Sequence, residues 1–201
     1  MPEPAGHYFD GEPAVASRPA SVRLDLPDRS VTLATDRGVF SADRVDAGTK
    51  YLLLDAPPPP ATGAFVDLGC GYGPIACTLA ARAPAATVWA IDVNRRALEL
   101  CRTNASKLGL GNVRVAAAEA VPRDLVVDLL WSNPPIRIGK PALHELLHTW
   151  LARLSPTGTA VLVVQKHLGA DSLHRWLEEQ DLRVVRLGSR AGYRLLEVRR
   201  A

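Results

Sequence analysis

The sequence contains few cysteines and no long apolar run, and each absence excludes a class of protein. Cys70, Cys77 and Cys101 are an odd number without metal-ligand spacing, so we expect reduced thiols in or near the core rather than a disulfide framework. No apolar run approaches the roughly 18 residues of a membrane helix, and the N-terminus lacks a charged-then-apolar signal pattern. We therefore expect a cytoplasmic protein without a membrane partner.

The sequence also lacks internal repeats, and its one biased segment is the proline run at residues 57–60. With 201 residues, 47% of them hydrophobic and 22% charged, it has the composition of one globular domain with a substantial core. Four successive prolines form a stiff, extended spacer that neither a helix nor a central strand tolerates. We therefore predict a boundary here, between an N-terminal extension over residues 1–56 and the main domain over residues 57–201.

The N-terminal extension, which opens with His7-Tyr8-Phe9, has the pattern of a small β-hairpin. Apolar and polar residues alternate over residues 22–26 and again over 31–33, on either side of Pro27-Asp28-Arg29, which can form a turn. Asp46-Ala47-Gly48-Thr49 then leads into an apolar helix start around Leu52. The hairpin and this helix are the elements that we expect before the proline run.

Strands and helices alternate beyond the prolines. The strands are almost continuously apolar, as expected when helices cover both faces of a parallel sheet. The two last strands lie close together around Gly188 and Gly192, so we expect an antiparallel pair at the sheet edge. The pattern predicts an α/β fold with a doubly wound, seven-stranded, mostly parallel sheet. We expect strands over Ala64–Asp67, Thr87–Ile91, Val113–Ala117, Val126–Ser132, Thr159–Gln165, Leu182–Leu187 and Tyr193–Val198, and helices over Pro74–Ala83, Arg95–Leu108, Lys140–Leu154 and Ala170–Glu179.

Residues suited to ligand binding follow the first four strands of the sheet. Asp67 and the glycine-rich turn over residues 69–73 follow the first strand, and Asp92, Glu119 and Asn133 follow the next three. Ligands of such sheets bind beyond the carboxyl ends of the strands, where an acidic residue can accept hydrogen bonds from ribose hydroxyls. Asp92 could instead favour the start of the next helix, and Glu119 could be a simple loop carboxylate.

The turn spacing D-x-G-x-G-x-G does not fit the dinucleotide pattern G-x-G-x-x-G. Together with Asn133-Pro134-Pro135-Ile136, Gly38-Val39-Phe40-Ser41, Asp46-x-Gly48-Thr49 and Val164-Gln165-Lys166, it resembles the class I S-adenosylmethionine-dependent methyltransferases. Within them, the chain is similar to the small-domain group that includes 16S ribosomal RNA guanine-N2 methyltransferases. The resemblance covers about residues 38–200. It implies a Rossmann-like catalytic domain, S-adenosylmethionine as cofactor, and small-subunit ribosomal RNA or the subunit itself as partner. It places the cofactor against Thr49, Asp67, Gly69, Cys70, Gly71, Gly73, Asp92, Val93, Glu119, Ala120 and Asn133.

The Asn-Pro-Pro-Ile segment has the residues needed to activate an amino nitrogen. The lone pair of a conjugated amino group is poorly available for attack. Hydrogen-bond acceptors for both of its N–H groups favour a pyramidal nitrogen, which can attack an electrophilic methyl group in line. Asn133 would supply one acceptor through its side chain and Pro134 the other through its carbonyl, which the two prolines would direct into the pocket. A plain loop terminator after a strand is the alternative.

Ile136 differs from related tetrads that end in an aromatic residue able to stack on a flipped base. Phe40 could supply the missing ring, although a place in the core is the alternative. Arg137, Lys140 and Lys166 lie at the same end of the predicted sheet, where they could contact phosphate or form an ordinary solvated surface.

Two other features bear on metal and RNA binding. His144-Glu145-Leu146-Leu147-His148 fits the zinc pattern H-E-x-x-H, but no third ligand follows it in a recognised pattern, so we expect no metal. Residues 181–201 contain six arginines and two acidic residues, a net charge of +4 in a chain of net charge +3. Such a basic edge suits RNA, or it protects an exposed strand from aggregation.

The sequence therefore predicts an N-methyltransferase that uses S-adenosylmethionine and acts on an exocyclic amino group, with guanine N2 of 16S ribosomal RNA as the first candidate. The alternatives within enzymes are an adenine N6, a tRNA base or a protein glutamine, because the same acceptor pair would serve them. A non-catalytic RNA-binding or ribosome assembly factor is the alternative of another class.

Overall fold

The computed structural model describes residues 15–201, so the His7-Tyr8-Phe9 segment lies outside the described residues. Seven strands pair in the order β5-β4-β3-β6-β7-β9-β8, and β9 runs antiparallel to both of its neighbours. The strands of this sheet are β3 (Ala64–Leu68), β4 (Thr87–Ile91), β5 (Val113–Ala116), β6 (Val127–Ser132), β7 (Leu154–Gln165), β8 (Leu182–Arg190) and β9 (Tyr193–Arg200). The predicted α/β sheet and its antiparallel edge are confirmed.

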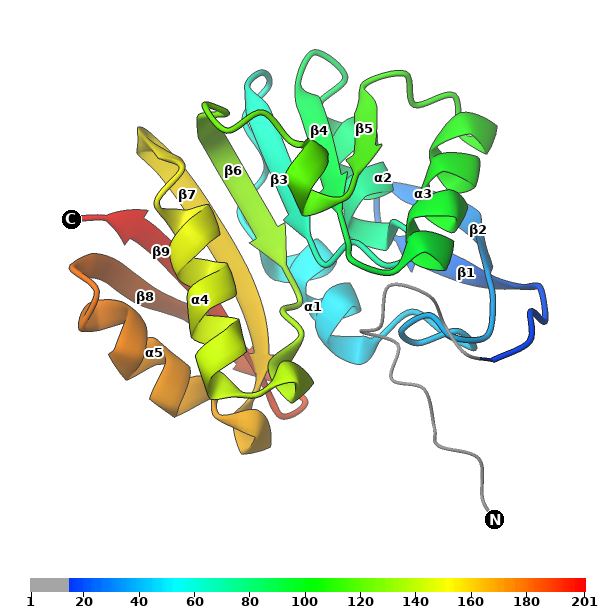
Figure 1. The fold of residues 1–201 in the computed structure, drawn as a ribbon. Coiled ribbons are helices and arrows are strands. Elements are labelled where there is room, and N and C mark those ends of the chain that lie inside the picture. Colours follow the sequence, from blue (N-terminus) through cyan, green and yellow to red (C-terminus); the bar gives the residue numbers. More distant parts are fainter. Residues whose placement is uncertain (1–14) are drawn as a thin grey trace.

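Helices cover both faces of the sheet (Figure 1). One hydrophobic cluster joins the sheet to three helices, and a second joins the opposite face to two more. The first group is α1 (Ala47–Asp55), α2 (Pro74–Arg82) and α3 (Arg95–Lys107), and the second is α4 (Lys140–Leu151) and α5 (Ala170–Glu178). Both faces of the central strands are therefore buried, which explains their continuously apolar sequences.

The predicted hairpin is present as β1 (Ala20–Leu26) and β2 (Arg29–Thr35), paired antiparallel beside the main sheet. Leu24 and Leu33 belong to the same hydrophobic cluster as α1, α2 and α3. The side chain of Asn104 on α3 accepts a hydrogen bond from the N–H of Ala34 and donates one to its carbonyl, at 2.7 and 2.9 Å. The hairpin is thus fixed to the helices that follow the proline run.

The boundary between the fourth helix and the next strand differs from the prediction. The helix that we expected to reach Leu154 ends at Leu151, and β7 begins at Leu154 rather than at Thr159. Leu154 pairs with Val127 of β6 and is buried, so the sheet rather than helix propensity decides its conformation. The pairing with β6 is irregular over residues 154–159, because Val127 pairs with Leu154 but Leu129 pairs with Thr159. A Cβ at Gly158 would lie 2.6 Å from the carbonyl oxygen of Val127, so the two strands approach closely here.

The order in which successive strands join the sheet reverses at β3, which pairs in parallel with β4 on one side and with β6 on the other. The carboxyl ends of β3, β4 and β6 meet at this point, so the segments after them share one edge of the sheet.

All three free cysteines are buried, as predicted. Among residues 15–201, no helix is both long and apolar enough to cross a membrane.

Candidate active site

The glycine-rich turn after β3 is held by Asp92, the residue that follows β4. The backbone N–H of Gly71 donates to one oxygen of the Asp92 carboxylate at 2.8 Å, and the N–H of Asn94 donates to the other at 2.9 Å. Burial raises the pKa of Asp92, although these backbone hydrogen bonds oppose the effect. A carboxylate has about four acceptor sites, so Asp92 can accept a further hydrogen bond from a ligand.

Asp67 supports the turn from behind. It is completely buried, and one carboxylate oxygen accepts a hydrogen bond at 2.8 Å from the N–H of Ala76 in the first turn of α2. The other oxygen is buried without a hydrogen-bond partner among the described residues. Burial, assisted by the nearby charge of Asp92, raises the pKa of Asp67 to about 8. Asp67 does not line the cavity in front of the turn.

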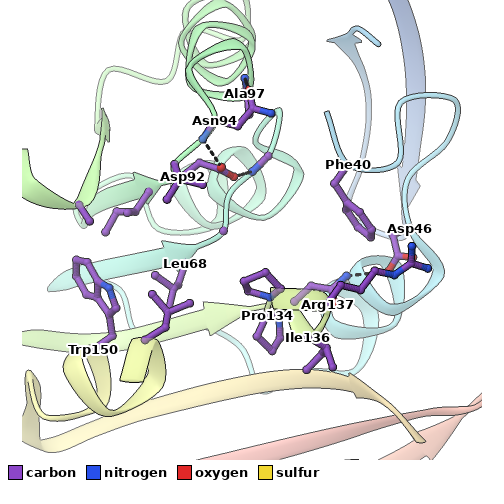
Figure 2. Close-up of a pocket in the computed structure, with 18 of the residues that line it drawn as sticks. Phe40, Asp46, Leu68, Asp92, Asn94, Ala97, Pro134, Ile136, Arg137 and Trp150 are labelled. Carbon is purple, nitrogen blue, oxygen red and sulfur yellow. Dashed lines mark hydrogen bonds between the residues drawn. The ribbon is translucent and has the colours of Figure 1, made fainter. Parts of the chain in front are cut away.

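That cavity has a volume of about 290 Å³ and lies between the segments after β3, β4 and β6. Figure 2 shows Pro134 near its middle, with Leu68 and Trp150 on one side and Phe40 and Asp46 on the other. Apolar side chains of α4 form part of its wall, and these were not among the predicted site residues. The lining includes Phe40, Asp46, Leu68, Gly69, Gly71, Ile91, Asp92, Val93, Ala118, Asn133, Pro134, Pro135, Ile136, Arg137, Leu146, Trp150, Gln165, Leu168 and Tyr193.

The segment after β6 forms a tight turn. The N–H of Ile136 donates to the carbonyl of Pro134 at 2.8 Å, and Pro135 between them has φ −74° and ψ 69°, the geometry of an inverse γ-turn. The Ser132 hydroxyl fixes the strand end by donating to the carbonyl of Leu68 at 2.6 Å. The Pro134 carbonyl thus already accepts one hydrogen bond and keeps a second lone pair.

The side chain of Asn133 is fixed by residues that precede the proline run. Its amide nitrogen donates to a carboxylate oxygen of Asp46 at 2.8 Å and to the hydroxyl of Thr49 at 3.1 Å. Thr49 and Cys70 line a smaller pocket of about 30 Å³ that adjoins the main cavity. Asp46 was not predicted to lie at the site, and its position before a helix start was the signal available for it.

Several other predicted site residues lie outside the cavity lining. Glu119 and Ala120 are exposed on the short 3-10 helix η1 (Ala118–Ala120), where Ala118 faces the cavity instead. Lys140 and Lys166 are exposed at the starts of α4 and η3 (Lys166–Leu168). Gly73 is the N-cap of α2, with φ +94°, and a Cβ there would lie 2.7 Å from the sulfur of Cys101, so both the backbone and the packing require glycine.

Two predicted substrate contacts, in contrast, lie at the cavity. Phe40 is 40% exposed and Arg137 is exposed, and both line the cavity beside Ile136. The preceding Gly38 is fixed because its carbonyl accepts a hydrogen bond at 2.8 Å from the side chain of Asn94. Phe40 is therefore placed at the cavity rather than in the core.

The H-E-x-x-H segment lies on α4. His144 stacks on Trp176 of α5 with ring centroids 3.8 Å apart, while Glu145 and His148 are exposed. Among residues 15–201, no group of three or more His, Cys, Asp or Glu residues could hold a metal ion. The ring stacking gives His144 a packing role between the two helices.

Residues 30–197 match the family model of the methyltransferase small domain. The chain is 33% identical to the uncharacterized protein YbxB of Bacillus subtilis, over 96% of this chain and 98% of the relative. It is also 31% identical to ribosomal RNA small subunit methyltransferase C of Shewanella halifaxensis, over 73% of this chain but only 43% of that relative. Its fold is similar to that of the T. thermophilus 16S rRNA N2 methyltransferase RsmC, solved with AdoMet and guanosine. The TM-score is 0.75 at 23% identity, over 94% of this chain and 52% of the other. The chain therefore belongs to the methyltransferase small domain family.

Proposed function

We propose that this protein transfers a methyl group from S-adenosylmethionine to an exocyclic amino nitrogen of RNA, with guanine N2 of 16S ribosomal RNA as the first candidate. The observation that carries the proposal is the orientation of Asn133. Its amide nitrogen is engaged by Asp46 and Thr49, so its amide oxygen remains as an acceptor at the cavity. The family match and the rRNA methyltransferases among the relatives support the RNA substrate.

The cavity suits the cofactor that the family uses. Gly71 lines it, and a Cβ there would meet nothing within 4 Å, so the turn leaves room for a ligand against its backbone. Asp92 offers acceptors suited to the ribose hydroxyls, and Leu68, Ile91 and Trp150 form an apolar wall suited to the adenine ring. When bound, S-adenosylmethionine supplies an electrophilic methyl group on a sulfonium sulfur.

The tetrad residues would position and polarise the amino group of the substrate. The amide oxygen of Asn133 accepts a hydrogen bond from one N–H of the amino group. The remaining lone pair of the Pro134 carbonyl accepts a hydrogen bond from the other N–H. Both contacts favour a pyramidal nitrogen whose lone pair can attack in line. The nitrogen would take the methyl group as the carbon–sulfur bond breaks with its electron pair left on the sulfur. It would then release one proton to water, so no strong base is required. Pro135, at the centre of the γ-turn, holds the Pro134 carbonyl, while Asp46 and Thr49 hold the Asn133 amide.

RNA contacts would come from the cavity mouth. Phe40 is suited to stacking on the base, because the tetrad ends in Ile136 rather than an aromatic residue. Arg137 at the mouth, with Lys140 and Lys166 beyond it, is suited to phosphate contacts. In this proposal, residues 57–201 are the catalytic domain and residues 1–56 are an extension that contributes Phe40 to the substrate site. A ribosomal RNA substrate would place the enzyme in the cytoplasm.

The large ribosomal subunit is a second candidate substrate because of a particular relative. The chain is 27% identical to ribosomal RNA large subunit methyltransferase G of Shewanella amazonensis, over 80% of this chain and 43% of the relative. Since the chain spans less than half of that relative, similarity does not choose between the two RNAs. The experiment must therefore examine both.

The test compares methylated nucleosides in 16S and 23S RNA from cells with and without the gene, by mass spectrometry. We expect one N2-methylguanosine to disappear without the gene and to return with the wild-type gene, but not with the Asn133→Ala variant. An unchanged RNA profile accompanied by a lost protein methylation would contradict the proposal and favour a glutamine substrate.

A further inference from the structure

Asp46 lies between the start of α1 and Asn133, which are far apart in the sequence. Its carboxylate precedes α1, and one oxygen accepts hydrogen bonds from the backbone N–H groups of Gly48 at 2.9 Å and Thr49 at 3.1 Å. The same oxygen accepts the hydrogen bond from the amide nitrogen of Asn133 at 2.8 Å, across 87 residues of sequence. Asp46 therefore caps a helix and binds the amide of the tetrad with the same oxygen.

This contact determines which way the Asn133 amide faces. A carboxylate only accepts hydrogen bonds, so the amide must turn its NH2 group toward Asp46. The reverse orientation would bring the amide oxygen about as close to the carboxylate as the nitrogen is now, with no proton between them and a repulsive contact. Thr49 engages the second hydrogen of the same NH2 group at 3.1 Å. The amide oxygen is thereby kept for a partner in the cavity.

Asp46 is itself held in place by the start of α1 and by Tyr193. As the cap of α1 it lies at the positive end of the helix dipole, which favours its negative charge. The hydroxyl of Tyr193 on β9 lies 3.4 Å from its second oxygen. A Cβ at Gly48 would lie 2.5 Å from the Tyr193 ring, so this glycine lets β9 pack closely against the start of α1. These contacts explain the Asp46-x-Gly48-Thr49 motif as one support beneath Asn133.

We infer that Asp46 is a positioning residue for methyl transfer, which acts by orienting the Asn133 amide toward the amino group of the substrate. The inference rests on the proposed function and extends it. It means that residues before the proline run complete the catalytic site, rather than only contacting RNA or covering the cavity.

The first test is a double-mutant cycle with S-adenosylmethionine and RNA isolated from cells without the gene. We expect Asp46→Ala to lower kcat by about tenfold or more while the cofactor Kd changes by less than about twofold. Asp46→Asn keeps an acceptor oxygen and a good helix cap, so we expect it to recover most of kcat. The Asp46→Ala/Asn133→Ala double variant should be no slower than Asn133→Ala alone, because Asp46 acts through Asn133.

The matched control is Asp43→Ala, which removes an exposed carboxylate from the same loop and should leave kcat unchanged. Effects of the two substitutions that multiply in the double variant would overturn the inference while leaving the proposed function intact. If the wild-type protein methylated neither RNA, the proposed function would fail instead.

A second test does not depend on activity. In NMR spectra of the 21.6 kDa protein, the Asn133 side-chain NH2 signals can be identified by their loss in Asn133→Ala. We expect both protons to exchange slowly with solvent in the wild type and about tenfold faster or more in Asp46→Ala, with Asp43→Ala as the control. Equal exchange in the wild type and in Asp46→Ala would overturn the inference whatever the substrate is.

Discussion

The carboxylate of Asp92 accepts a hydrogen bond at 2.8 Å from the backbone N–H of Gly71, so the residue expected to bind ribose also fixes the glycine-rich turn. Asp92→Ala would remove both contributions, whereas Asp92→Asn keeps one acceptor oxygen. We expect the cofactor Kd from calorimetry to rise by about 100-fold for the alanine variant and by about tenfold for the asparagine variant. The control is Asp124→Ala, at an exposed loop position. Equal affinity of Asp92→Ala and the wild type would contradict this role.

The buried Asp67 predicts an unusual pH dependence of stability. Burial raises its pKa from 3.8 to about 8, so between these values the folded protein holds a proton that the unfolded chain releases. The free energy of unfolding should therefore decrease as pH rises from about 4 to about 8, and level off above that. The pKa of Asp92 is also raised and acts in the same direction.

Thermal unfolding of the wild type and of Asp67→Asn at pH 5 to 9 measures this effect. We expect the wild-type Tm to fall over this range by on the order of 5 °C more than that of Asp67→Asn, which cannot ionise. A parallel pH dependence of the two proteins would show that Asp67 is ionised in the folded state.

Substitution of Phe40 should weaken the binding of RNA more than the binding of the cofactor. If its exposed ring stacks on the substrate base, Phe40→Ala should raise KM for RNA by about tenfold, equivalent to about 1.4 kcal/mol, and leave the cofactor Kd unchanged. Phe40→Tyr should retain the wild-type KM. Leu54→Ala is a suitable control, because Leu54 is similarly exposed on α1 and does not line the cavity. An unchanged KM for Phe40→Ala would exclude stacking by this ring.

The hairpin is attached to α2 by an ion pair between Asp28 and Arg82. Two nitrogens of the guanidinium donate to the two carboxylate oxygens at 2.9 and 3.1 Å, and a third contact joins Arg82 to the carbonyl of Leu53 at 2.9 Å. We expect Asp28→Ala to lower the free energy of unfolding by about 1 kcal/mol and Arg82→Ala by about 2 kcal/mol, measured in urea. Exposed Arg123→Ala is the control, and an equal effect of all three would contradict this attachment.

The sequence was sufficient to predict the sheet, and to predict that Asp92 and Asn133 lie at the same edge of it. Continuous apolar strands indicate a sheet covered on both faces, and parallel strands end at one edge, so residues after β4 and β6 converge near the turn that follows β3. This convergence depends only on the order of the strands and not on how individual side chains pack.

Contacts that depend on packing could not be predicted in the same way. The hydrogen bond from Asn133 to Asp46 depends on how α1 docks beside β9, and no local pattern specifies that docking. The spacing of apolar residues predicts that Leu146 and Trp150 share one face of α4, but it does not indicate that this face lines the cavity. The early start of β7 at Leu154 likewise depends on pairing with β6.

The most direct test of the account is transfer of radiolabelled methyl from S-adenosylmethionine to 16S RNA from cells without the gene, by the wild type and by Asn133→Ala. The account predicts label in N2-methylguanosine with the wild type and a rate about 100-fold lower with Asn133→Ala, at an unchanged cofactor Kd. Transfer by Asn133→Ala at the wild-type rate would contradict it.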